Sequence, residues 1–125
     1  MNQRAAKPTV NLLENLPPPA DAEYIDELAA AEGVRLERII SNGHASPPGF
    51  WYDQSEAEWV FVIAGKARLQ IEDEVAERQL GPGDSLYLPP HCRHRVTWTD
   101  ADRPTVWLAL FIDADKDPKP RGTRQ

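Results

Sequence analysis

The chain has 125 residues, which is the length of one domain and enough to bury a core without disulfide or metal crosslinks. Its 14 basic and 20 acidic residues give a formal net charge of −6, which excludes the positive surface that a nucleic-acid partner requires. No apolar run approaches the about 18 residues of a membrane helix, and a lone cysteine with no visible secretory signal favours a cytoplasmic protein without membrane contact.

The N-terminal part of the chain divides into two segments. Residues 1–20 are polar and marked by prolines, which predicts a partly flexible tail. The next segment is rich in helix formers, with Asp21 as a candidate N-cap and Gly33 as a natural stop. Its apolar residues recur at helical spacing, namely Tyr24, Ile25, Leu28 and Ala31. We therefore predict a short helix over residues 21–33, packed on the outside of the following domain.

After Gly33 the hydrophobic pattern changes to a period of two, which is typical of strands. Turn residues separate eight short runs: 34–40, 50–54, 58–64, 67–72, 75–80, 85–88, 91–97 and 105–112. Such closely spaced strands without intervening helices predict an all-β sandwich or jelly-roll barrel over residues 34–112. Residues 113–125 alternate in charge and have no core pattern, so we expect a flexible C-terminal tail.

Two short motifs within these runs give a more specific indication. The first pairs Glu58 with Gly65, and the second pairs Gly83 and Pro89 with His94, at fixed offsets between strand-like runs. This layout resembles the two sequence motifs of the cupin superfamily, and in particular its small conserved-barrel (cupin 2 type) proteins. The resemblance implies a double-stranded β-helix, which is a jelly-roll barrel with a site in its interior.

In cupins the interior site holds a divalent metal through two histidines and a glutamate of the first motif and a histidine of the second. Here Tyr52 and Gln54 stand at the positions of the first two histidines, so only Glu58 and His94 keep ligand types. The resemblance thus implies a site for Fe, Mn, Ni or Zn at Glu58 and His94, with the Gln54 amide oxygen as a weaker third ligand. His91 would add a second imidazole if its loop bent inward; the alternative is a histidine at the rim, bonded to backbone or solvent.

A metal-free site is the alternative interpretation of the same residues. Tyr52, Gln54, Glu58 and His94 could form hydrogen bonds directly with a small organic ligand. Cys92 has the parity of His94 in a strand, and Trp98 could line a pocket, so both are ligand-binding candidates as well. For each of these two residues, packing in the core is the simpler alternative.

Two strands are apolar on both faces, 59–63 and 106–111. One short helix cannot cover both outer faces, which predicts a homodimer. For function, we expect a small-molecule enzyme with a divalent metal, whether oxygenase, isomerase or lyase. The alternatives are a metal-free binding barrel and a dimeric interaction module without catalysis.

Overall fold

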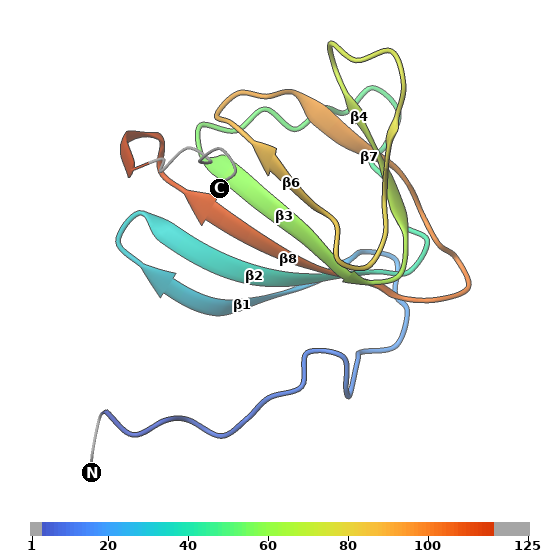
Figure 1. Ribbon diagram of the computed structural model, residues 1–125. Coiled ribbons are helices and arrows are strands. Elements are labelled where there is room, and N and C mark those ends of the chain that lie inside the picture. Colours follow the sequence, from blue (N-terminus) through green and yellow to red (C-terminus); the bar gives the residue numbers. More distant parts are fainter. Residues whose placement is uncertain (1–3, 117–125) are drawn as a thin grey trace, which may run out of the picture.

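The computed structural model describes residues 4–116, which form two facing antiparallel sheets (Figure 1). The five-stranded sheet has the order β1 (Tyr24–Ala31), β2 (Val34–Ser41), β8 (Thr105–Ile112), β3 (Ala57–Ala64) and β6 (Ser85–Leu88). The three-stranded sheet has the order β5 (Arg78–Leu80), β4 (Ala67–Ile71) and β7 (His94–Thr99). A single 3-10 turn, η1 (Ala114–Lys116), follows β8. This arrangement confirms the all-β jelly-roll prediction.

The predicted N-terminal helix is wrong, because residues 24–31 form strand β1. The strand pairs antiparallel with β2 and so covers backbone N–H and C=O groups that would otherwise form the edge of the sheet. Helix propensity is a weak preference that such tertiary pairing overrides. Gly33, expected to end a helix, instead sits with φ of 77° in the two-residue turn between the strands. The barrel therefore begins at residue 24, ten residues before the predicted boundary at residue 34.

Strand alternation separates an inner from an outer face in the five-stranded sheet. Along β3, Val60 and Val62 are buried in the core with Trp107 of β8, whereas Trp59 and Phe61 point to the outer face. Leu69 of β4 closes the same core from the opposite sheet. The core thus lies between the two sheets and leaves the outer face of β3 and β8 apolar.

The structure lacks one predicted strand and starts two others later than expected. Within residues 50–54 only Tyr52 is paired, by one bridge to His94, while β5 begins at Arg78 rather than Val75 and β7 begins at His94 rather than His91. Pro90 accounts for the late start of β7, because it lacks the N–H that a ladder requires. These irregular segments close one end of the barrel, over the space between the sheets.

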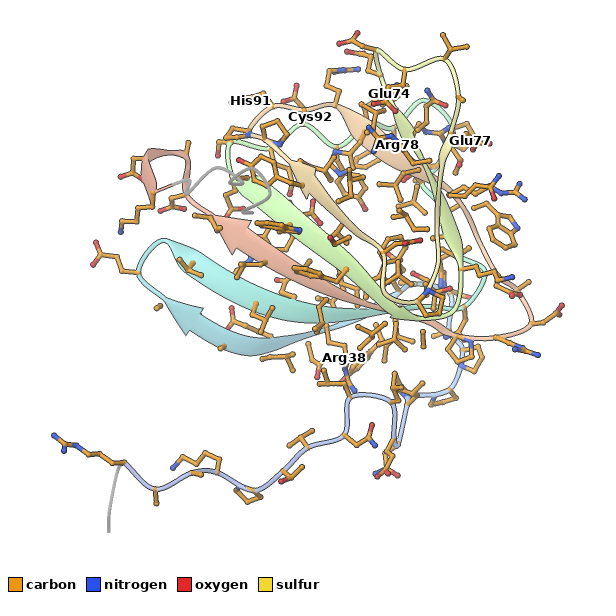
Figure 2. The ribbon with its side chains drawn as sticks, in the orientation of Figure 1. Arg38, Glu74, Glu77, Arg78, His91 and Cys92 are labelled. Carbon is orange, nitrogen blue, oxygen red and sulfur yellow. The ribbon has the colours of Figure 1, made fainter. Side chains whose placement is uncertain are left out.

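The N-terminal segment contacts the barrel at Leu12. From residue 4 the segment runs apart from the barrel, below β1 in the view, before it turns up toward β1 (Figure 1). Arg38 of β2 points toward it and donates a hydrogen bond to the Leu12 carbonyl oxygen at 3.0 Å (Figure 2). Residues 1–3 and 117–125 of the two predicted flexible tails lie outside the described part. Between residues 4 and 116, no helix has the length and apolar character needed to span a membrane.

Candidate ligand-binding site

A cavity of about 230 Å³ lies between the two sheets. Its apolar walls come from strands of both sheets, with Val60 and Trp107 on one side and Leu69 and Val96 on the other. Polar side chains reach the same cavity from β2, β3, β7 and the segments before β1 and before β3. An apolar cavity with a few polar groups is the usual form of a small-molecule site.

Glu58 and His94 are the two buried ionisable residues of this cavity. Glu58 begins the inward-facing series of β3, and His94 begins β7, so the two residues approach from opposite sheets. Their side chains are only 11% and 6% exposed, and Glu58 Oε1 lies 3.6 Å from His94 Nε2. A distance of 3.6 Å exceeds a hydrogen bond, so the pair is close without being joined.

The hydrogen bonding of His94 fixes which nitrogen faces the cavity. Nδ1 lies 2.8 Å from the Cys92 carbonyl oxygen, and because a carbonyl only accepts, Nδ1 carries the proton. In the neutral ring, Nε2 then presents a lone pair toward Glu58. With a neutral ring, two acceptors face one another across 3.6 Å, which is a suitable place for a hydrogen-bond donor from a bound molecule.

Tyr52 and Gln54 complete this cluster from the segment before β3. The Gln54 amide Nε2 donates to Glu58 Oε1 at 3.1 Å, and the Tyr52 ring stacks on the His94 ring with centroids 5.2 Å apart. Burial, followed by the negative charges of Glu23 and Glu58, raises the pKa of the Tyr52 hydroxyl. Tyr52 therefore remains a neutral donor at physiological pH, close to both carboxylates. We call Tyr52, Gln54, Glu58 and His94 the inner cluster.

Three further charged residues line the cavity and were missed in the sequence. Arg35 and Glu37 point inward from β2, and Glu23 reaches in from just before β1. Arg35 forms ion pairs with Glu37 and Glu56 and lies over the Phe111 ring, 4.1 Å from its centroid. The parity of Arg35 and Glu37 with the apolar Ile39 was the available signal, but charged residues on a strand are usually assigned to the solvent face.

His91 does not reach the cavity. Its side chain is 68% exposed, and Nδ1 lies 2.7 Å from Asp53 Oδ1 on the outer side of the loop. The backbone takes a φ of 61°, a left-handed conformation, while its N–H donates to the Gln54 carbonyl oxygen at 2.7 Å. The structure thus places the His91 ring at the rim, bonded to the Asp53 carboxylate rather than to backbone or solvent. Figure 2 shows its position at the same end of the barrel as Cys92.

Cys92 and Trp98 also lie outside the cavity lining. Cys92 precedes β7, so strand parity does not apply to it, and its side chain packs against the core. Burial, with Glu74 and Asp73 nearby, raises the pKa of its thiol, so the reactive thiolate is disfavoured. Trp98 lies on the far face of the three-stranded sheet, 36% exposed, with the Arg68 guanidinium 4.8 Å from its ring centroid. Neither residue is placed to contact a molecule in the cavity.

The residues present do not fit a first-row metal well. Among residues 4–116, no three side chains of His, Cys, Asp and Glu come together in a way that could hold a metal ion. Glu58 and His94 supply two such ligands, and the Gln54 amide and Tyr52 phenol are weaker ones. The donor set is closer to that of a hydrogen-bonding site than to a closed metal centre.

Comparisons with known proteins agree with this architecture. A structure from Ralstonia eutropha JMP134, described as a putative mannose-6-phosphate isomerase, is 50% identical with a TM-score of 0.83, covering 86% of this chain and 100% of that one. A Cupin 2 conserved barrel domain protein from Salinispora arenicola CNS-205 has 21% identity, a TM-score of 0.63, and coverage of 89% and 92%. A cupin superfamily protein from Desulfitobacterium hafniense DCB-2 has 15% identity, a TM-score of 0.64, and coverage of 78% and 84%.

The last two similarities, at low identity, concern the fold alone. No curated protein matches the chain. The sequence model of the cupin domain family matches residues 38–111, which run from the second half of β2 to the next-to-last residue of β8 and include the whole inner cluster. The match covers more than half of the chain and contains both motifs that the sequence indicated. The chain therefore belongs to the cupin domain family.

Proposed function

We propose that the protein binds a small polar organic molecule inside the barrel, through the inner cluster, without a metal. The observation that carries this proposal is the convergence of four polar side chains on one apolar cavity. Its volume of about 230 Å³ is below the about 300–1,000 Å³ of sites for drug-sized ligands, which favours a smaller molecule. Tyr52 and Gln54 supply donors and acceptors there, and Glu58 and His94 supply acceptors.

Substitution of either buried ionisable side chain, Glu58 or His94, tests this proposal. The probes are a panel of small monosaccharides, amines and carboxylates, and the readout is the set of NMR shifts of the Trp107 indole N–H and the Gln54 amide. We expect at least one probe class to shift these signals in the wild type, and Glu58→Ala and His94→Ala to abolish the shifts. Glu72→Ala, which removes an exposed carboxylate paired with Arg93, is the matched control and should leave them unchanged. Shifts that persist in both cavity variants would contradict the proposal.

The metal-dependent form of the proposal keeps Glu58, His94 and Gln54 as ligands of Fe, Mn, Ni or Zn. Elemental analysis of untagged protein purified without chelator separates the two forms. Stoichiometric metal that is lost in Glu58→Ala would replace the metal-free form. Protein that contains no metal and cannot be loaded with any of the four would support the metal-free form.

A second candidate function is isomerisation of a sugar phosphate, which the 50% identical relative favours by its description. A base such as Glu58 is available for proton transfer, but the phosphate would need a cationic group. Arg35 is the guanidinium in the cavity lining, and it is already paired with Glu37 and Glu56. We therefore expect no conversion of mannose 6-phosphate to its ketose isomer; turnover that Glu58→Ala abolishes would establish the isomerase instead.

We also propose a homodimer formed through the outer face of the five-stranded sheet. Trp59 and Phe61 of β3 stack there with centroids 6.0 Å apart, beside the outward-facing Leu108 of β8. These three side chains are partly buried, and a partly exposed apolar face of this kind is typical of an interface. We expect light scattering to give about twice the chain mass of 14.1 kDa, and Phe61→Glu to halve it. Arg68→Glu on the other sheet is the control, and a monomeric wild type would contradict the proposal.

A further inference from the structure

The charges around the cavity are unbalanced. Its lining contains three carboxylates, of Glu23, Glu37 and Glu58, against the single guanidinium of Arg35. With His94 neutral, the formal balance is −2. Arg35 is held by Glu37 and by Glu56, so its charge is already compensated. An anionic ligand would enter a negative cavity with no available cation, which is costly at low dielectric.

Two of these carboxylates, from different parts of the chain, affect the same hydroxyl group, that of Tyr52. Glu23 stands before β1 and binds the Ser41 hydroxyl, which also accepts the Trp107 indole N–H at 3.0 Å. Glu58 enters from β3. Burial and, after it, the negative charges of Glu23 and Glu58 raise the pKa of the Tyr52 hydroxyl, so both carboxylates act on this cavity-lining group.

A second, independent observation is an acceptor atom of a buried residue that opens onto the cavity. His94 is 5% exposed, and Nδ1–H donates to the Cys92 carbonyl oxygen, so the lone pair of Nε2 points into the cavity. Its nearest acidic oxygen, Glu58 Oε1, is an acceptor 3.6 Å away. Within the described chain no hydrogen bond reaches Glu58 Oε2 either. A ligand group that carries several N–H donors would satisfy these acceptors together.

Aromatic rings border the same space. Trp107 and Phe111 line the cavity from β8, and Tyr52 lines it from the segment before β3. Ring faces attract ammonium groups through their quadrupoles, most strongly where water is excluded. The Arg35 guanidinium lies over the Phe111 ring and Tyr52 stacks on His94, so Trp107 is the ring that we assign to this contact. The apolar part of the lining suits a short hydrocarbon chain beside the charged group.

We propose that the ligand is a small organic cation, a primary or secondary ammonium, held by Glu58 and His94 and bordered by Tyr52 and Trp107. This inference rests on the proposed function, because it names the chemical class of the molecule in that cavity. It differs from the sugar phosphate that the similar Ralstonia protein suggests. An ammonium supplies the missing donors and the missing positive charge at once.

Four probes of matched shape or stated charge test the inference on the full chain. Butylammonium, 1-butanol and butyrate share a carbon chain and differ in charge, and mannose 6-phosphate represents the sugar phosphate. NMR shifts of the Trp107 indole N–H and the Gln54 amide report binding inside the cavity. We expect butylammonium to bind at least about tenfold more tightly than butanol and butyrate to bind least, since a charge-assisted hydrogen bond is worth about that factor.

Isosteric variants link the preference to the carboxylate. Glu58→Gln should lower the affinity for butylammonium by about tenfold and leave the affinity for butanol almost unchanged. Glu77→Gln, on an exposed residue that contacts Thr97, is the control and should change neither. If Glu58→Gln fails to fold, Glu23→Gln tests the same preference from the side of the cavity next to β1. It should also lower the affinity for butylammonium.

The outcomes separate the inference from the proposed function. Butyrate or mannose 6-phosphate binding in the cavity as tightly as butylammonium would overturn the cation inference and leave a small-molecule site in place. Equal affinity for butylammonium and butanol would also overturn the cation inference and leave the small-molecule site in place. No shift at Trp107 or Gln54 with any of the probes at millimolar concentration would contradict both proposals.

Discussion

The two histidines at the closed end of the barrel lie three positions apart and have opposite environments. His94 is 6% exposed, stacked on Tyr52 and directed at Glu58, whereas His91 is 68% exposed and bonded to Asp53. Residues 52–54, which the Tyr52 bridge joins to His94, also divide between inside and outside. Tyr52 and Gln54 line the cavity, and Asp53 points outward. Alternation thus separates the side chains of residues 52–54, whereas the irregular backbone before β7 separates the two histidines.

The largest expected effect comes from removing the inner histidine. His94→Ala leaves a void beside Glu58 and takes away the ring on which Tyr52 stacks. We expect the free energy of unfolding to fall by about 2–4 kcal/mol. His91→Ala removes an exposed contact and should cost no more than about 1 kcal/mol. Urea denaturation of both variants measures the difference, and equal losses would contradict the contrast between the two environments.

A second prediction adds a metal ligand to the inner side. Gln54→His places an imidazole beside Glu58 and His94, which completes a set of two histidines and one carboxylate. Zinc affinity should rise by at least about tenfold, or about 1.4 kcal/mol. Asp53→His, one position away and outward-facing, is the matched control and should not raise it. Isothermal titration with zinc measures both, and a larger gain at position 53 would mean that the two residues exchange faces in solution.

Much of this arrangement was predictable from sequence because it depends on local patterns. The motif residues Gly65, Gly83 and Pro89 mark turns, and strands β6 and β8 begin and end at the predicted residues. Gly65 has a φ of 83°, and a Cβ there would lie 2.5 Å from the Thr105 backbone, so no other residue fits without a shift. Turns of this kind require particular residues, so their positions can be predicted from the sequence.

The unpredicted features depend on contacts between distant segments. Residues 24–31 have helix propensity, but pairing with β2 decides their conformation, and that pairing leaves no local pattern. Arg35 is similar, because its inward position depends on Glu37, Glu56 and the Phe111 ring together. Cys92 was assigned by parity across a segment that is not a strand. Local periodicity cannot reveal where a strand begins when prolines interrupt it.

A third, smaller effect is the pH dependence that Tyr52 confers. Burial, then Glu23 and Glu58, raises the folded-state pKa of this tyrosine above its ordinary value of 10.0. The stability that the neutral hydroxyl contributes is fully present below about pH 10 and is lost as pH rises through the folded-state pKa. Wild-type protein should lose stability above about pH 10 more steeply than Tyr52→Phe, by at most about 1.4 kcal/mol per pH unit. Urea denaturation across this range measures the difference, and parallel curves would place Tyr52 in solvent.

The smallest effect concerns the outer histidine and its backbone. His91 has a φ of 61°, a conformation that glycine adopts freely and an L-residue adopts at a cost. Both His91→Gly and His91→Ala lose the bond to Asp53, so their difference isolates the backbone. We expect His91→Gly to be more stable than His91→Ala by about 1 kcal/mol in urea denaturation. Ligand affinity should be the same in both, because no atom of the His91 side chain lines the cavity. Equal stabilities would show that the loop relaxes out of the left-handed conformation. A difference in ligand affinity would show that residue 91 contributes to the site and does not lie at the rim.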